Sequence, residues 1–467
     1  MGLFNNIRQW IGAIFKSKEL FGVKSVNSQQ MDSFIQKCER IYQGKPDWLD
    51  PNNDIKTIGF AKAICSEIAR LATLNIGILI EGSARAKYLQ KQIDDCYYQL
   101  RSWVEYAAAY GAIILKPNGV SIDVVLPADY IVTDVQNGKI RGCVFINRAT
   151  NESQTKYYTR LEYHRFIEGN YYISNRCFVG NYRDSLDDAV DIKETPWSQL
   201  TEDVIVTNTN ELLFGLLAMP NANNIDINSP LTMPVFSDAI EELKDLDIAY
   251  SLNAKEIAES SRIVLLDSDR MLPNNPNAIR MNADNNASRS KMGLPKYVRI
   301  LDSTDNAQDM YQEINPNLNT DVRVNGINAL LSQIGYKCGF SNGYFVFNQK
   351  SGITTATQVE ADQQRTIQLI KDVRDKLQSC LDDVINAMNV FADIYQLAPY
   401  GTYEVTYSFG DMLYNYEDDK SHWWSYVQSG KMPFWRYLVK FENMTKEDAK
   451  QIQAETEVKD KTLFEDE

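Results

Sequence analysis

The feature of the sequence that most constrains its fold is a helical pattern that continues without interruption from Thr357 to Tyr395. Thr357 and Glu360 have the spacing of a capping box, which predicts that the helix begins there. Such a helix would be roughly 55–60 Å long. It needs a partner along most of its length, because its apolar side chains form one stripe: Ile367, Ile370, Leu377, Leu381, Val384, Ile385, Met388 and Ile394.

A shorter helical pattern precedes this one, and a loop without helical period separates the two. The loop, GFSNGYFVFNQKSGITTA at 339–356, contains three glycines, which favour mobility. A helix, a loop and a long helix in succession indicate a structural role more than a catalytic one. The first helix is expected to place these apolar residues on one side: Leu318, Val322, Ile327, Leu330, Leu331 and Ile334.

Composition limits the possible partners of the chain. Hydrophobic residues make up 44% of the 467 residues and aromatic residues 11%, which is enough for a packed core. The net charge of −14 argues against a surface that grips nucleic acid, since such surfaces are usually basic.

The cysteines and the apolar segments bear on the compartment. The seven cysteines are scattered without a C-x-x-C motif, which favours reduced thiols in a cytoplasmic protein. No apolar run approaches ~20 residues and no signal peptide is evident, so no membrane partner is expected. The N-terminus predicts an amphipathic helix that docks on its own or a neighbouring subunit, with a membrane surface as the alternative; its apolar face comprises Leu3, Ile7, Trp10, Ile11 and Ile14.

The first half of the chain combines helices with a run of short strands. Helices are predicted at Ile58–Leu71 and Lys87–Tyr110, and strands at Ile76–Ile80 and Ala112–Lys116. Residues 120–208 then alternate in the manner of an antiparallel sheet, which makes the fold class α+β. Hairpin turns are predicted at Asn137-Gly138 and Gly169-Asn170.

The second half begins with a helix at Phe236–Ser261 whose polar side is acidic, and the simplest interpretation of that side is a solvated face. Two strand-like segments around a polar, locally basic stretch follow it. After the long helix, a strand is predicted at Tyr403–Phe409, followed by three short helices at His422–Val427, Pro433–Phe441 and Thr445–Val458.

Motifs for catalysis and for cofactors are missing or misplaced. The sequence has no phosphate-binding loop, and its two histidines, His164 and His422, lie in unrelated contexts, so no metal, cofactor or catalytic residue is expected. Gly339–Gly343 matches G-x-S-x-G, but a nucleophile elbow needs a strand before the serine and a helix after it. A hydrolase built on Ser341 is kept as an alternative.

The loop and the start of the long helix resemble the tunnel-loop region of portal proteins of tailed double-stranded-DNA bacteriophages, of the long-tailed type. Thr355–Val359, TATQV, is similar to the Thr-Ala-Thr-acidic/polar-Val motif of that family. Other resembling segments follow in the family's order, namely 1–15, 57–80, 239–265 and 429–457. The resemblance implies an elongated subunit with a wing at 1–228, a first stem helix at 229–262, a clip at 263–311, a second stem helix at 312–338, a tunnel loop at 339–356, a long wing helix and closing strand at 357–412, and a C-terminal crown at 413–467.

The resemblance also implies a function and a set of partners. Portal proteins form a ring, usually a dodecamer, at one capsid vertex of the virion, and double-stranded DNA passes through its centre during packaging and ejection. The partners implied are further copies of this chain, the major capsid protein, the scaffolding protein, the terminase large subunit and a head–tail adaptor, with assembly in the host cytoplasm. The stripe of the long helix would then lie partly against adjacent subunits. A different head or head–tail adaptor protein is the structural alternative.

Three groups of site residues follow from the resemblance. The loop residues expected in the DNA channel are Asn342, Asn348, Gln349 and Lys350, and the alternative packs the loop on its own subunit through Tyr344, Phe345 and Phe347. The acidic stem residues expected to face the channel, or alternatively a neighbouring subunit, are Glu241, Asp245 and Glu256. The clip residues expected to make contacts are Arg280, Arg289 and Lys291.

Overall fold

The structure is a computed structural model, and it confirms the α+β class predicted from the sequence. It describes residues 2–49, 55–151, 153, 155–182, 186–207, 209, 211–227, 229–259, 263–267, 296–300, 311–314, 320–347, 356–410, 416–442, 444 and 448–454. The chain forms two compact units, of which the first comprises 1–73 and 78–407 and the second 74–77 and 408–467.

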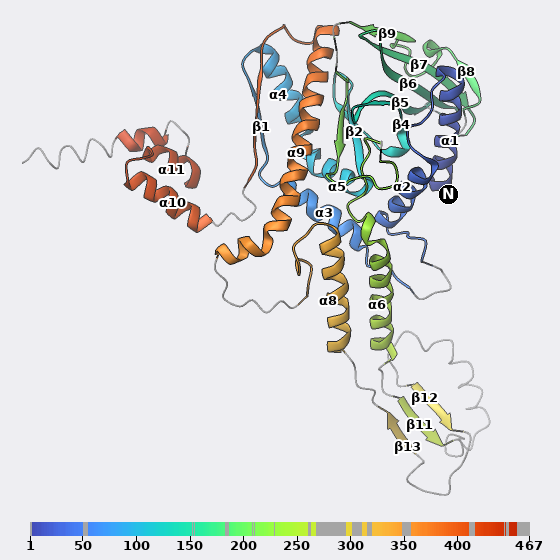
Figure 1. The fold of residues 1–467 in the computed structure, drawn as a ribbon, viewed down its shortest axis with the longest axis vertical. Helices are drawn as coiled ribbons and strands as arrows, with labels where there is room; N and C mark the ends of the chain where they lie inside the picture. The colour runs from blue at the N-terminus through green and yellow to red at the C-terminus, as the bar shows by residue number, and fades with distance from the viewer. Residues whose placement is uncertain are drawn as a thin grey trace, which may run out of the picture. The chain divides into compact units, whose positions relative to one another are not determined.

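Two antiparallel sheets form the centre of the first unit (Figure 1). The larger has the order β4 (Tyr130–Gln136), β5 (Lys139–Thr150), β6 (Tyr157–Ile167), β7 (Asn170–Gly180) and β8 (Asp188–Val190), and β9 (Asp203–Val206) also pairs with β7. The smaller has the order β10 (Gly215–Ala218), β2 (Ala112–Pro117) and β3 (Ile122–Val125).

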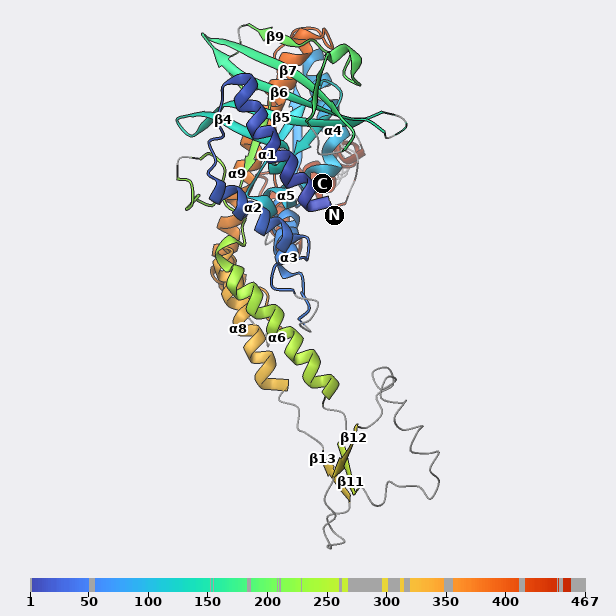
Figure 2. The same cartoon turned by 90° about the vertical axis from the view of Figure 1, so that its right-hand side faces the viewer.

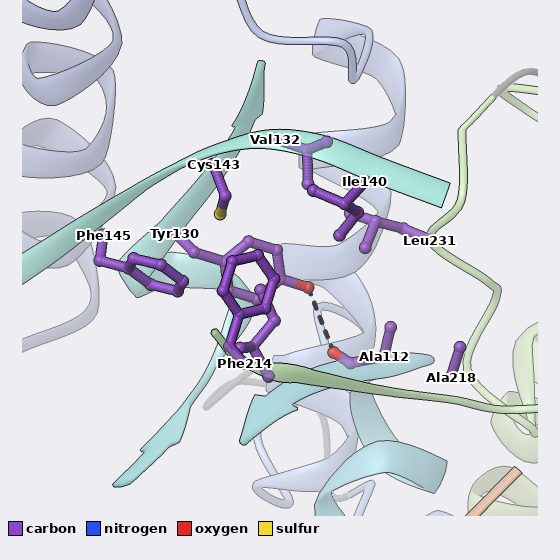
Figure 3. Packing of buried hydrophobic residues seen from close by; sticks show 10 residues of the cluster. Ala112, Tyr130, Val132, Ile140, Cys143, Phe145, Phe214, Ala218 and Leu231 are labelled. Atoms are coloured by element: carbon purple, nitrogen blue, oxygen red, sulfur yellow. Dashed lines mark hydrogen bonds between the residues drawn. The ribbon is translucent and has the colours of Figure 1, made fainter. Parts of the chain in front are cut away.

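The hydrophobic core fills the space between these two sheets (Figure 3). Phe145 on β5 packs against Phe214 beside β10, with ring centroids 5.1 Å apart in an edge-to-face arrangement. The buried Tyr130 donates its hydroxyl to the carbonyl of Ala112 at 3.4 Å, so its polar end is satisfied. The opposite face of the larger sheet packs against helix α1 (Gly2–Phe21) through Ala13.

The hairpin turns of the larger sheet explain its register. Asn137 and Gly138 both have positive φ, as the first predicted turn requires. At the second turn Glu168 and Gly169 have positive φ, so this turn lies one residue earlier than predicted and Asn170 is the first residue of β7.

The long helix α9 spans Ala356–Ile394, 39 residues, one residue earlier at each end than the predicted Thr357–Tyr395. It packs on β10 and β2 and on the helices α3 (Phe60–Ala72) and α4 (Ala84–Cys96) of the same chain. Its stripe is buried there at Ile370, Leu377, Leu381, Val384, Ile385 and Met388, whereas Ile394 is exposed. At these buried positions the chain itself covers the stripe, so the expectation that adjacent subunits cover it is wrong there.

Two features fasten α9 to the strands and helices of the first unit. A Cβ atom on Gly215 of β10 would lie 2.5 Å from the carbonyl oxygen of Cys380, so only glycine allows the strand to approach the helix this closely. The buried Arg374 on α9 donates to the carbonyls of Leu71 and Ala72 at 3.0 and 3.1 Å. It thereby satisfies acceptors that the C-terminal end of α3 leaves free.

The predicted helix Lys87–Tyr110 is interrupted in the structure. A 3₁₀ turn at Tyr97–Gln99 separates α4 from helix α5 (Leu100–Tyr110). The interruption allows the two helices to pack differently, because α4 contacts α9 whereas α5 contacts α3 and helix α2 (Gln29–Tyr42). Periodicity could not reveal this break, because both halves are amphipathic.

Two helices and a small sheet follow the larger sheets in sequence. Helix α6 (Ile240–Glu259) lies alongside helix α8 (Thr320–Lys337), as both views show (Figures 1 and 2). Between them in sequence, β11 (Ile263–Asp267) pairs in parallel with β12 (Lys296–Ile300) and antiparallel with β13 (Tyr311–Ile314). The last strand falls at the start of the range predicted as the second stem helix, and α8 begins only at Thr320.

The remaining strands and helices complete the described fold. Strand β1 (Gly77–Glu81) pairs with β14 (Glu404–Ser408). The second unit contains α10 (Tyr416–Gln428) and α11 (Phe434–Phe441), which pack through an aromatic cluster that includes Trp423 and Tyr437. All seven cysteines are free and buried. Within the described residues, none of the helices combines the length and the apolar character that a membrane crossing requires.

Candidate functional site

The loop between α8 and α9 has an aromatic base that packs on its own chain. Phe340, Tyr344 and Phe345 form a cluster with ring centroids 4.8–5.0 Å apart. Phe345 also meets Phe60 at the start of α3, edge to face, with centroids 5.2 Å apart. The cluster therefore holds the first part of the loop against α3, as the alternative interpretation of the loop predicted for Tyr344 and Phe345.

A charged pair strengthens this attachment. The hydroxyl of Tyr344 donates to Glu67 on α3, and Arg70 one turn later binds the same carboxylate through Nε at 2.8 Å and Nη2 at 2.6 Å. Arg70 lowers the pKa of Glu67, so the carboxylate remains an acceptor at neutral pH. Burial, together with the bond to Glu67, raises the pKa of Tyr344 to about 12, so the hydroxyl stays a donor.

Helix α8 holds the other described end of the loop. The side chain of Asn328 accepts from the N–H of Phe347 at 2.9 Å and donates to its carbonyl at 3.1 Å. This amide completes both hydrogen bonds of one backbone residue, as a neighbouring strand would. Phe347 itself exposes 55% of its surface, so the backbone and not the ring anchors this position.

Ser341, the serine of the G-x-S-x-G match, is buried and bonded to α9. Its N–H donates to Thr366 Oγ1 at 2.8 Å, and its hydroxyl oxygen accepts from the Thr366 hydroxyl at 3.0 Å. A nucleophile elbow has a strand before the serine and a helix directly after it. Ser341 instead follows helix α8 and is followed by turns. These hydrogen bonds attach the loop to the long helix.

The predicted channel residues of the loop fall on both sides of the described boundary. Asn342 is exposed, and its side-chain oxygen accepts from the hydroxyl of Ser332 on α8. Asn348, Gln349 and Lys350 lie outside the described residues. The described part of the loop is anchored as far as Phe347.

The acidic stem residues have different surroundings. Glu241 and Asp245 are exposed on α6. Glu256, by contrast, forms an ion pair with Arg323 on α8, which joins the two helices of one chain. Its charge is partly compensated there, so among the three predicted residues Glu241 and Asp245 present the more open negative charge.

A second pair of contacts joins the opposite ends of these helices. Lys337 at the end of α8 donates to Glu242 at 2.6 Å and to the carbonyl of Asp238 at 2.9 Å. Burial would raise the pKa of Glu242, but the bond to Lys337, a backbone hydrogen bond and the charge of Lys337 together outweigh it, and the pKa is lowered. The helix pair is therefore fastened near both of its ends.

One member of the acidic run, Asp247, corrects the interpretation of a uniformly solvated face. It is only 3% exposed. Its two oxygens accept from the indole N–H of Trp48 and from the N–H of Ile58, both at 2.9 Å. Asp247 thus ties α6 to the segment before α3, a role that helical periodicity alone could not distinguish from a surface position.

The clip residues Arg280, Arg289 and Lys291 lie outside the described residues. Of the expected clip, the structure describes β11, β12 and the first residue of β13. In the described part of the chain, no group of three or more His, Cys, Asp or Glu side chains is arranged to hold a metal ion.

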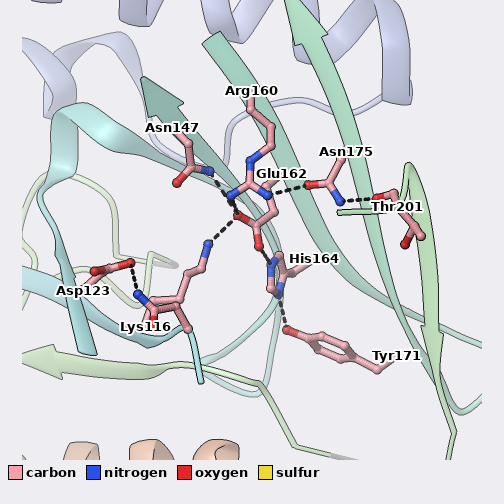
Figure 4. A network of polar contacts seen from close by, with 10 residues as sticks. Lys116, Asp123, Asn147, Arg160, Glu162, His164, Tyr171, Asn175 and Thr201 are labelled. Carbon is pink, nitrogen blue, oxygen red and sulfur yellow. Dashed lines mark hydrogen bonds and ion pairs between the residues drawn. The ribbon is translucent and has the colours of Figure 1, made fainter. Parts of the chain in front are cut away.

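Sequence reasoning missed a buried polar network centred on Glu162 of β6 (Figure 4). Its signal was present in Arg160-x-Glu162-x-His164, since residues two apart on a strand share one face. That face lies between the two sheets, beside Phe145. Three polar residues on the inner face of a strand would have predicted a buried network.

Comparisons with known proteins do not extend this list of candidate residues. A scan against profiles of protein families finds no match for this chain, and neither does a search among curated proteins.

Proposed function

We propose that this chain is a portal subunit, one member of a ring that conducts double-stranded DNA during genome packaging and ejection and performs no catalysis itself. The observation that carries the proposal is the order of the elements: a helix, a small three-stranded sheet, a second helix fastened to the first, an aromatic-based loop and a 39-residue helix. This order agrees with the portal resemblance of the sequence.

The anchored loop supports a role at a channel wall. Contacts with α3, α8 and α9 hold the chain up to Phe347, and the residues that follow include Lys350, the one cation of 339–356. One lysine per subunit would give a ring of weak, releasable phosphate contacts. A dense basic patch would instead hold DNA and oppose its movement.

Exposed acids on α6 support the same role. Glu241 and Asp245 carry negative charge on the helix that the resemblance assigns to the stem. Repeated around a ring, these charges would repel phosphates and keep DNA away from the wall. The partners that belong to the proposal are the major capsid protein, the scaffolding protein, the terminase large subunit and a head–tail adaptor, at one vertex of the virion.

Electron microscopy of the purified chain in negative stain tests the proposal. We expect rings with a central hole, and light scattering at micromolar protein should give a mass many times that of the 53.4 kDa chain. A monomer under these conditions would contradict ring formation. A small, closed assembly without a hole would favour another structural protein of the virion.

Deleting Gln349–Gly352 tests the loop itself. The deletion leaves the anchors at Tyr344 and Phe347 in place, so rings and procapsids should form while DNA packaging or retention falls. Normal packaging would remove the loop from the proposed channel. Ser341→Ala is the matched control, because it alters the anchored half of the same loop; if this variant loses a measurable hydrolase activity while rings persist, the hydrolase alternative gains support.

A further inference from the structure

The Glu162 network joins the two sheets of the first unit (Figure 4). One carboxylate oxygen accepts from Lys116 on β2 of the smaller sheet, and from Arg160 and Asn147 of the larger sheet, both at 3.0 Å. The other accepts from His164 Nε2 at 2.8 Å. The carboxylate is therefore the point at which both sheets meet.

His164 extends the network to a second crossing between the sheets. Its Nδ1 lies 2.7 Å from the hydroxyl of Tyr171 on β7. The Tyr171 oxygen in turn accepts from the N–H of Leu213, just before β10, at 3.3 Å. His164 is 1% exposed and Tyr171 is fully buried, so water does not replace these partners.

The partners fix the protonation state of the imidazole. Burial would raise the pKa of Glu162, but Lys116, His164 and Arg160 outweigh it and hold the pKa well below its usual range. An ionised carboxylate only accepts, so Nε2 of His164 must carry a proton. In the neutral imidazole Nδ1 is then bare, so it accepts from the hydroxyl of Tyr171, whose oxygen accepts from the N–H of Leu213.

Protonation of this imidazole would disturb both crossings. Lys116 and Arg160 already place two cations around one carboxylate, and a charged His164 would add a third. Nδ1 would become a donor facing Tyr171, whose hydroxyl would lose its acceptor. Burial lowers the pKa of His164, and the two cations add to the effect, whereas Glu162 opposes it.

We propose that His164 makes the junction between the two sheets acid-sensitive, so that a falling pH loosens β2 and β10 from β6 and β7. The groups that face the imidazole are Glu162 and Arg160 on its own strand, Lys116 on β2, Tyr171 on β7, and the thiol of Cys143, which pairs with it on β5. The sensitivity belongs to the folded chain and does not depend on ring assembly.

Hydrogen exchange followed by mass spectrometry tests this proposal on the full chain without a histidine tag. Exchange rates of peptides from β2, β6, β7 and β10 are corrected for the intrinsic effect of pH, and the opening constant is compared between pH 7.5 and 5. We expect it to rise below about pH 6.5, by up to tenfold per pH unit. Carboxylates with raised pKa values, such as Asp32, act in the opposite direction. Glu162, whose pKa is lowered, acts in the same direction as His164, but only near and below the ordinary glutamate pKa of about 4.3.

Two variants separate the histidines. His164→Gln retains an amide donor for Glu162 but does not titrate, so its opening constant should not rise as the pH falls from 7.5 to 5. His422→Gln, the matched control, should keep the wild-type dependence, since these are the only two histidines of the sequence. An equal pH dependence in wild type and His164→Gln would overturn the proposal.

A second measurement does not rely on a folded variant. Exchange of the imidazole C2 hydrogen in the wild-type chain reports the titration of each histidine separately by mass spectrometry. We expect His164 to exchange slowly, with a midpoint below its ordinary pKa of about 6.5. A midpoint at or above that value would overturn the proposal, because the imidazole would then be charged without opening the junction.

Discussion

Replacing Arg85 by methionine removes the group that holds the C-terminal end of α9. The guanidinium is 1% exposed and makes five hydrogen bonds from α4. It donates to the carbonyl and side-chain oxygens of Asn389 at 2.8 Å, to Asp393 at 2.6 Å, and to the carbonyls of Ala398 and Pro399 at 2.8 and 3.1 Å. Several of these acceptors lie where the helix can no longer supply donors.

The expected cost is smaller than the sum of the five bonds. Hydrogen bonds to a charged group contribute about 1.5–3 kcal/mol each when measured singly. However, a cavity of about 460 Å³ is lined by Asp393, Ala398 and Pro399, and the side chain of Asp393 is 50% exposed. Water can therefore reach several of the acceptors after the replacement. We expect Arg85→Met to lower the free energy of unfolding by about 3–5 kcal/mol, because two or three acceptors left without a donor cost about 1–3 kcal/mol each.

Urea denaturation at a fixed protein concentration, followed by tryptophan fluorescence, measures this loss. Arg85→Lys should lie between wild type and Arg85→Met, because an ammonium group has three donors where guanidinium has five. Arg101→Met is the matched control. The Arg101 guanidinium is exposed and its hydrogen bond to Ser66 is long, at 3.5 Å, so the free energy of unfolding should change by less than about 1 kcal/mol. If Arg85→Met is no more destabilised than this control, the guanidinium does not hold the helix end.

Three further predictions use other buried or partly buried groups. Leu381→Ala should cost about 2–5 kcal/mol in urea denaturation regardless of oligomeric state, because the side chain is buried within its own chain; a loss that appears only in the assembled protein would contradict this. Burial, with a contribution from Asp226, raises the pKa of Asp32 to about 7, so the folded state loses stability as pH rises from about 4 towards 7. Asp32→Asn should therefore be more stable than wild type by about 1–2 kcal/mol at pH 8, with the gain disappearing near pH 4 in thermal unfolding at a series of pH values. Tyr344→Phe should keep the ring cluster but remove the hydrogen bond from the loop to Glu67, so trypsin or thermolysin should cut the loop several times faster than in wild type, and unchanged cleavage would refute the anchoring role.

The sequence predicted α9 and its apolar stripe because both depend on spacing within one segment. It did not predict which surface covers the stripe, since Gly215 and Cys380 meet only when distant segments pack. The buried position of Asp247 could not be predicted for the same reason. The sequence of a helix does not show whether a carboxylate on it binds water or a distant side chain such as Trp48. For the candidate site, the aromatic anchoring of the loop was foreseen as an alternative, whereas Asn328 was not, because an asparagine within a helix carries no signal for a backbone partner.

Two of the buried arginines, Arg85 and Arg374, have a consequence for the timing of folding. Arg374 bonds to Leu71 and Ala72, and Arg85 to Asn389, so each contact joins residues about three hundred positions apart. At a synthesis rate of roughly 5–20 residues per second, the first segment waits on the order of 15–60 s for its partner. During that interval the apolar faces of α3 and α4 that α9 will cover are open to solvent and to other nascent chains. Completion of the first unit is thus a late event, and the rate of translation through α9 sets how long the chain is vulnerable to aggregation.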